Sequence, residues 1–315
     1  MSGSFQTNTY SLQAPGQPGD FASSNPRATA LSSQIYNSAG FRAGPNGLTI
    51  GLFAWLDTST YTLASNSGSG VPTGFVHRDN NALITTYLNA YGTTIPAGFP
   101  VGCIFTEGEF FALNAGTTEA TPGMKAYANN VTGVVTFAAT GNPTTSATST
   151  ASTIAAGTAS VTASITDNVM TVTAVGSGTL YAGSICSGTG VATGTAIVNQ
   201  LTGTTGGVGT YTVSIRDQSV ASTTVSTTYG LLTIGGTVTG TYAVGDTVAG
   251  SGISAGTVIT QLGTGTGQAG TYIVNLTQTI SSQAINVYST TETQWYCRSF
   301  GLAGDVVKIS SRAVG

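Results

Sequence analysis

His77 is the only histidine in the chain, so it is the first candidate for general acid–base chemistry. It begins the string His77-Arg78-Asp79, which also occurs in the catalytic loop of protein kinases. The glycine-rich loop, the lysine strand and the Asp-Phe-Gly motif of kinases are missing from this sequence. A general base also needs a nucleophile or an acid as its partner. We therefore interpret His77 as a structural or interface histidine beside a local Arg78–Asp79 pair.

Two glutamates, Glu107 and Glu109, are spaced so that they would share one face of a strand. Paired carboxylates can cleave a glycosidic bond or bind Ca²⁺. Phenylalanines at positions 105, 110 and 111 surround the pair. This pattern favours a strand whose acidic side meets solvent or a partner. We predict neither a catalytic residue nor a metal ligand here.

The run Gly-Thr-Gly-Gln-Ala-Gly at 265–270 matches the GxGxxG pattern of dinucleotide-binding sites. In such sites the loop opens a helix whose N-terminus holds the pyrophosphate. Here the strand-forming run Thr-Tyr-Ile-Val follows at 271–274. We predict a hairpin turn and no cofactor.

The three cysteines, Cys103, Cys186 and Cys297, are odd in number and far apart. They fit neither a disulfide framework nor the spacing of metal ligands. We predict three reduced, mostly buried thiols.

Charged residues are scarce, with 8 Lys+Arg and 11 Asp+Glu among 315 residues. This is 6%, against about 25% in an ordinary soluble domain. A net charge of −3 offers no basic surface for nucleic acid. No stretch approaches ~18 consecutive apolar residues, and the N-terminus lacks the pattern of a secretory signal. We expect no nucleic-acid partner, no membrane span, no secretion signal and no enzymatic activity.

The residue types predict an all-β fold. Thr, Val, Ile and Tyr favour strands, and the 44 glycines, with Ser, fill turns. Good helix formers other than Ala are scarce. We expect outer strands at 48–55, 74–78, 101–106, 295–298 and 306–309, and a short helix or strand at 81–91.

Composition changes sharply along the chain, which indicates two kinds of domain. All nine prolines lie at or before Pro143, and every Phe and Trp lies at or before Phe137 or at or after Trp295. Insertions are tolerated at exposed loops whose ends lie close together. We predict a discontinuous β domain, residues 31–145 plus 290–315, that is interrupted by an insertion.

The insertion contains an internal repeat. Residues 169–172 match residues 231–234 at an offset of 62, and Gln200-Leu201 matches Gln261-Leu262 at an offset of 61, so one residue has been lost in a turn. We predict two small β-sandwich-like modules with thin cores that pack on each other, residues 146–228 and 229–289. The Ser/Thr/Ala-rich run 144–160 is interpreted as the entry linker of the first module, and a pair of poorly patterned strands is the alternative.

Six segments outside the insertion together carry a resemblance to a known family. They are residues 14–27 (APGQPGDFASSNPR), 43–55 (AGPNGLTIGLFAW), 72–78 (PTGFVHR), 95–98 (IPAG), 292–296 (ETQWY) and 304–311 (GDVVKISS). On these segments the chain resembles the structural cement (capsid decoration) proteins of tailed bacteriophages. Members of that family are typically short, so the insertion is the departure from it.

The resemblance implies a jelly-roll-like or β-barrel body on the outer surface of the phage head. That body would bridge subunits of the major capsid protein, and the repeat modules would project outward. A homo-dimer or homo-trimer on the capsid lattice is expected. The residues of this chain that carry the family motifs are Pro45, Asn46, Trp55, His77, Arg78 and Trp295.

The N-terminal segment, residues 1–30, carries three prolines and few core residues. We predict an extended arm that lies on the shell or is exchanged with a neighbour, and a disordered tail is the alternative. Large side chains would anchor the arm by burial. The predicted contacts of the arm are Phe5, Tyr10, Leu12, Phe21 and Arg27.

A phage tail-fibre or receptor-binding protein is the alternative function. Tyrosines of the modules would then stack on host-surface glycans, although two of them match across the copies, which favours core positions. The candidates are Tyr181, Tyr211, Tyr242 and Tyr272. The long trimeric stalk repeats that are usual in tail fibres are lacking.

Overall fold

Runs rich in Val, Ile, Thr and Phe alternate with Gly-rich turns, and the chain folds accordingly into strands. The computed structural model describes residues 16–31, 41–57, 62–78 and 93–312. All regular structure in these residues is β, which confirms the all-β prediction. No helix in the described ranges is long and apolar enough to cross a membrane. The predicted element at 81–91 lies outside the described residues.

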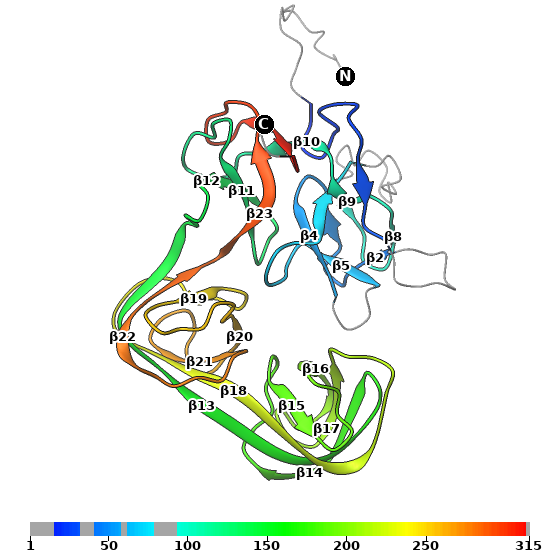
Figure 1. Cartoon of the computed structure of the whole chain (residues 1–315), viewed down its shortest axis with the longest axis vertical. Helices are drawn as coiled ribbons and strands as arrows, with labels where there is room; N and C mark the ends of the chain where they lie inside the picture. The colour runs from blue at the N-terminus through cyan, green and yellow to red at the C-terminus, as the bar shows by residue number, and fades with distance from the viewer. Residues whose placement is uncertain (1–15, 32–40, 58–61, 79–92, 313–315) are drawn as a thin grey trace, which may run out of the picture.

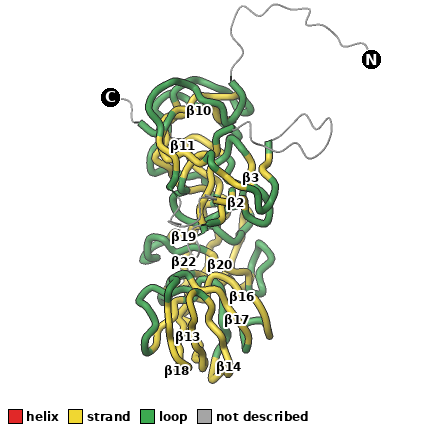
Figure 2. Tube along the Cα trace, turned by 90° about the vertical axis from the view of Figure 1, so that its right-hand side faces the viewer, coloured by secondary structure: helices red, strands yellow, loops and turns green. Residues whose placement is uncertain are grey.

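The strands before residue 140 and after residue 289 form a body at one end of the molecule, and the strands between them form two lobes (Figure 1). Turned by a quarter, the molecule shows the lobes below the body along the long axis (Figure 2). A seven-stranded sheet of the body has the order β1 (Ala28–Thr29), β9 (Ile104–Glu107), β6 (Gly74–Val76), β4 (Phe53–Leu56), β5 (Leu63–Ser65), β2 (Phe41–Ala43) and β8 (Pro100–Val101). A short pair joins β3 (Leu48–Thr49) and β7 (Thr94–Ile95).

A five-stranded sheet completes the body and joins strands from both ends of the chain. Its order is β10 (Glu109–Leu113), β24 (Val306–Ser310), β23 (Thr290–Cys297), β11 (Lys125–Asn129) and β12 (Val135–Ala138). The main core fills the space between this sheet and β4 and β6. Trp295 of β23 is 1% exposed and lies with ring centroids 6.3, 6.0 and 5.6 Å from Phe53, Phe75 and Phe110. The closing strands therefore supply one of the two tryptophans of a core built mostly by strands that precede the lobes in the chain.

Two outer strands differ from the prediction because glycines interrupt them. The predicted strand 48–55 is divided into β3 and β4 by a turn at Gly51, whose φ is 75°. A Cβ at Gly51 would lie 2.9 Å from the backbone of Pro18, so only glycine allows the N-terminal segment to approach this closely. Gly108, with a φ of 142°, ends β9 and separates Glu107 from Glu109. The two glutamates therefore lie on strands of different sheets, and the prediction that they share one face is wrong.

The lobes are built on two strands of 23 residues each, β13 (Thr145–Asp167) and β18 (Gln218–Gly240). They pair antiparallel along their whole length, from Ala147 opposite Gly240 to Asp167 opposite Gln218. The remaining strands are β14 (Val169–Ser177), β15 (Ile185–Gly188), β16 (Ile197–Gly203), β17 (Gly209–Val213), β19 (Thr247–Ala249), β20 (Ile259–Leu262), β21 (Gly270–Val274) and β22 (Ile280–Tyr288). The predicted linker at 144–160 is therefore wrong, because this run forms the first two thirds of one long strand.

Each long strand contributes one half to each lobe. The second half of β13 and the first half of β18 enclose the core of the distal lobe (residues 157–229), with β14 to β17. The first half of β13 and the second half of β18 enclose the core of the proximal lobe (residues 145–156 and 230–288), with β19 to β22. Ala147 and Ile154, which fall in the first predicted module, thus lie in the core of the second.

The repeat seen in the sequence is repeated in the hydrogen bonds. The hydroxyls of Tyr211 and Tyr272 donate to the carbonyls of Gly207 and Gln268, each at 2.6 Å. The run 265–270 is the hairpin loop between β20 and β21, as predicted. The last glycine of this loop has a φ of 148°, and its equivalent Gly209 has a φ of 152°. A Cβ at Gly209 would lie 2.0 Å from the Thr202 carbonyl, so the tight turn requires glycine.

The three cysteines are free and buried, as predicted. Cys103 lies in the body core, Cys186 in the distal-lobe core and Cys297 beside Trp295. Burial raises the pKa of Cys186 to about 12, so its thiol stays protonated at neutral pH.

The proximal lobe buries an acidic residue where the distal lobe has a neutral one. Asp246 of the proximal lobe is fully buried, and its Oδ1 has no hydrogen-bond partner among the described residues. Burial raises the pKa of this carboxyl above its usual value. The equivalent residue of the distal lobe is Ser184, since the carbonyls of Ser184 and Asp246 accept from Ile197 and Ile259 in the same way.

We predict that Asp246→Ser raises the melting temperature at pH 7 by a few degrees. A carboxyl whose pKa is raised in the folded state lowers the free energy of unfolding when the pH is above that pKa. This destabilisation disappears as the pH falls to the pKa of the carboxyl in the unfolded state, about 3.9. The gain should therefore shrink between pH 7 and pH 4 in thermal denaturation. The reciprocal Ser184→Asp should lower the melting temperature at pH 7. An Asp246→Ser protein no more stable than wild type at pH 7 would contradict the prediction.

Candidate functional site

The N-terminal segment adds a strand-like edge to the body. The amide of Gly19 donates to the Phe111 carbonyl at 2.8 Å, and the amide of Phe111 donates back to the Asp20 carbonyl at 2.9 Å. The amide of Ala22 donates to the Glu109 carbonyl at 2.9 Å. These bonds satisfy the open edge of β10, which would otherwise present unpaired backbone groups. Residues 16–30 of the predicted arm therefore pack on the body of their own chain.

Phe21 anchors this segment in a group of aromatic rings. Its ring stacks on His77 with centroids 3.7 Å apart and lies 5.4 Å from Phe105 and 5.2 Å from Phe110. The guanidinium of Arg27 covers the ring at 3.6 Å from its centroid. Offset and tilted aromatic contacts, together with a cation over the ring, stabilise beyond the area they bury.

Polar contacts fix the backbone of the same segment. Nδ1 of His77 lies 2.6 Å from the Gly19 carbonyl, which acts as the acceptor. Nε of Arg78 lies 3.3 Å from Oδ1 of Asp20, and a terminal nitrogen of Arg78 donates to the Pro18 carbonyl at 3.2 Å. About a third of each partner of this ion pair is exposed, so the pair contributes at most about 1 kcal/mol. Arg78 thus pairs with Asp20, whereas its predicted partner Asp79 lies outside the described residues.

The structure brings together only some of the predicted site residues. Phe21, Arg27, His77 and Arg78 form the anchoring site, and Trp295 reaches it through the ring of Phe110. The predicted contacts Phe5, Tyr10 and Leu12 lie outside the described residues, so their role stays a prediction.

Pro45, Asn46 and Trp55 lie elsewhere on the body. Pro45 and Asn46 lie in the turn after β2, and Trp55 is buried with its Nε1 donating to the Gly70 carbonyl at 3.0 Å. Pro45 and Trp55 line a cleft of about 610 Å³, and Val198 of the distal lobe lines it as well. No sequence pattern indicates this cleft, because its walls come from the body and from a lobe far along the chain.

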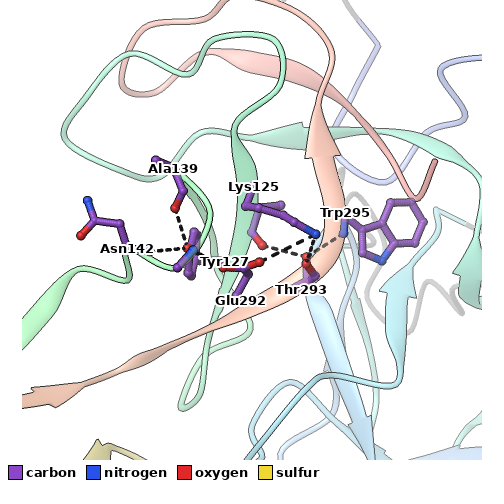
Figure 3. Close-up of polar contacts among 9 residues, drawn as sticks. Lys125, Tyr127, Ala139, Asn142, Glu292, Thr293 and Trp295 are labelled. Carbon is purple, nitrogen blue, oxygen red and sulfur yellow. Dashed lines mark hydrogen bonds and ion pairs between the residues drawn. The ribbon is translucent and has the colours of Figure 1, made fainter. Parts of the chain in front are cut away.

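A polar cluster at the junction of body and lobes was not predicted (Figure 3). The hydroxyl of Tyr127 lies 2.9 Å from Oε2 of Glu292 and 2.7 Å from the Ala139 carbonyl, and it accepts from the amide of Asn142 at 3.1 Å. Burial first, and then the hydrogen bond to Glu292, raise the pKa of Tyr127 to about 12. The hydroxyl therefore remains a donor at any ordinary pH.

Lys125 completes the cluster on β11. Its Nζ lies 3.8 Å from Oε1 of Glu292, donates to the Thr293 carbonyl at 3.1 Å and covers the ring of Tyr296 at 3.9 Å. The side chains of Lys125, Tyr127 and Glu292 thus tie β11 to β23 where β23 leaves the lobes (Figure 3). The cluster holds two strands in place.

The lobes offer little surface for stacking on sugars. Tyr211, Tyr242 and Tyr272 are at most 1% exposed, so their rings lie in the cores. Tyr181 is half-buried and packs edge-on against Tyr229 with centroids 4.9 Å apart. No three His, Cys, Asp or Glu side chains gather as a metal site in the part of the chain that the structure describes. The geometry of these groups supports roles in anchoring and packing.

The chain matches a known protein family. The family model of the XM1 gp53 minor capsid protein matches residues 5–173, more than half of the 315-residue chain. The chain belongs to this minor capsid protein family. The match covers the N-terminal segment, all body strands up to β12 and the whole of β13. No curated protein and no solved structure matches the chain.

Membership in the minor capsid protein family gives the chain a structural role in a phage capsid and places it in the virion. It agrees with the phage structural part of the resemblance noted in the sequence. The anchoring site around Phe21 falls within the matched residues, whereas Trp295 and the rest of β23 fall outside them.

We predict that Phe21→Ala releases the N-terminal segment of this minor capsid protein. Truncation of a fully buried Phe costs about 3–5 kcal/mol, and for this half-buried ring we expect about 2 kcal/mol from chemical denaturation. Limited proteolysis should then cut the segment between residues 16 and 30 faster than in wild type. Phe300→Ala is the matched control, because that ring is 71% exposed and its loss should change stability by less than about 0.5 kcal/mol. Equal effects of the two substitutions would contradict the anchoring role.

Proposed function

We propose that the protein is a non-enzymatic cement, or decoration, protein of the phage head. It binds the outer surface of the capsid, bridges subunits of the major capsid protein and stabilises the shell. The body, residues 31–145 plus 290–315, makes the contact, and the lobes project outward. The observation that carries the proposal is the minor capsid protein match over the N-terminal segment and the part of the body that precedes the lobes.

The physical basis is mass action. A shell packed with DNA is under internal pressure, and a protein that binds only the assembled lattice stabilises that state. Many identical contacts on a symmetric lattice also add avidity to weak single contacts. Such a role needs a contact surface and not a catalytic site. The polar clusters of the body, which hold strands together, fit this role.

The position of the lobes supports an outward projection. The chain enters and leaves them at one place, since Thr145 and Tyr288 are register partners and lie about 5 Å apart as cross-strand neighbours. The lobes lie below the body, on the side away from the tip of the β23–β24 hairpin (Figure 1). A body can therefore seat on a shell while the lobes point away from it.

Localisation in the particle tests the proposal directly. Cryo-electron microscopy of the phage should show the protein at regular positions on the outside of the head, and the occupied lattice sites would give its oligomeric state. Heads that lack the protein should lose DNA at a lower temperature than complete heads, and added protein should restore the difference. Density on the tail, with none on the head, would favour the receptor-binding alternative and overturn the proposal.

We predict that deletion of Ser146–Tyr288 leaves a folded body that still binds heads. The ends to be joined are cross-strand neighbours, so a short Gly-Ser connection between Thr145 and Ser289 replaces the lobes without strain. Cosedimentation with heads lacking the protein measures binding, and circular dichroism checks the fold. A folded but non-binding body would mean that the lobes carry the contact.

A further inference from the structure

Four of the eight cations of the chain gather at the end of the body farthest from the lobes. They are Arg27, Arg298, Lys308 and Arg312. Among the described residues, ion pairs form at Arg78, Lys125 and Arg216, and none of the four gathered cations takes part in one. In a chain with a net charge of −3 and only eight cations, this places half of the positive charges in one region.

Contacts between the segments keep these cations together. Arg298 donates through its guanidinium to the carbonyl of Arg312, and Arg312 donates to the Pro26 carbonyl at 3.2 Å, next to Arg27. The amide of Arg298 donates to the Lys308 carbonyl at 2.7 Å across the β23–β24 hairpin. Two carboxylates lie in the same region: Glu109, which interacts electrostatically with Arg298 and lies 3.3 Å from the Ser310 hydroxyl, and Asp305, which accepts from the amide of Leu302 at 2.9 Å. Four cations against these two carboxylates leave the region with a positive charge.

Two large apolar side chains stand beside the cations. Phe300 is 71% and Leu302 63% exposed in the loop between β23 and β24, which lies at the top of the molecule (Figure 1). The loop is held in shape by the buried Asn114, whose side-chain nitrogen lies 3.3 and 3.1 Å from the carbonyls of Gly301 and Leu302. Gly301 also forms a backbone bridge with Ala120. A pre-ordered loop loses little conformational entropy when its apolar side chains are buried by a partner.

We propose that this surface, formed by Arg27, Arg298, Phe300, Leu302, Lys308 and Arg312 and here called the end surface, docks on an acidic face of the capsid shell that has an apolar hollow. The inference rests on the proposed function and names the part of the body that makes the contact. Apolar anchors give the affinity, and cations at the rim select a partner of opposite charge. The occupant follows from charge complementarity, since a second copy would bring the same cations to the contact.

Charge reversal and truncation test the end surface in the full-length protein. The variants are Lys308→Glu, whose ammonium makes only a distant contact with the Phe111 ring at 5.9 Å, and Phe300→Ser with Leu302→Ser. We expect each to weaken binding to heads that lack the protein by about tenfold or more in cosedimentation. Raising the salt concentration should weaken wild-type binding more than that of Lys308→Glu, because exposed charges are screened.

Matched controls lie on other surfaces. Arg42→Glu reverses an exposed cation on β2, and Leu201→Ser with Val208→Ser removes apolar side chains of the distal lobe that are 51% and 45% exposed. These controls should bind within about twofold of wild type, and thermal denaturation checks that all variants fold. Folded end-surface variants that bind like wild type, or controls that lose binding to the same degree, would overturn the docking surface alone. Wild-type protein that does not bind heads would instead refute the proposed function.

Discussion

The antiparallel ladder between β13 and β18 is the interaction on which the lobes depend. The two lobe cores contain no Phe or Trp and are filled by Val, Ile, Leu, Ala, Tyr, Met and Cys, so each buries little apolar surface on its own. Ile154 and Val161 lie on one strand but in different cores. Unfolding of this strand in one lobe therefore disturbs the core of the other lobe as well. The shared ladder therefore couples the folding of the two thin cores, so that the two lobes form one cooperative unit.

The closing strand β23 connects the lobes to the body. β22 ends at Tyr288 and β23 begins at Thr290, so the lobes continue almost directly into the sheet that carries Trp295. The contacts of Glu292 with Tyr127 and Lys125 fix β23 against β11 at this point. A buried tryptophan at one end of the strand and a polar cluster at the other define its direction in the body. The side-chain amide of Asn130 donates to the Gly245 carbonyl at 2.8 Å, which ties the body directly to the proximal lobe.

Prediction from the sequence succeeds where local residue types decide the outcome. The all-β class, the buried thiols and the hairpin at 265–270 follow from propensity, spacing and turn chemistry. Prediction from the sequence fails where the structure of a segment depends on residues that are distant in the chain. The run 144–160 has Ile154 as its one large apolar residue and became a strand because β18 and β22 flank it on both edges. Likewise, Arg78 forms an ion pair with the distant Asp20 of the N-terminal segment, and the cluster around Tyr127 joins residues 165 positions apart.

The few charged residues of the chain lie at particular places in the fold. Among the described residues, the ion pairs lie where segments must be fixed: Arg78 with Asp20 at the N-terminal segment, Lys125 with Glu292 at the junction, and Arg216 with Asp167 at the tip of the distal lobe. A structural protein that repeats many times on a lattice gains from few surface charges, because like charges on neighbouring copies would repel one another. Charged residues that do not fix segments of the chain then indicate the charge of the partner that the protein would bind. Under the proposed function, their concentration beside Phe300 and Leu302, away from the lobes, marks the end of the body that would bind the shell.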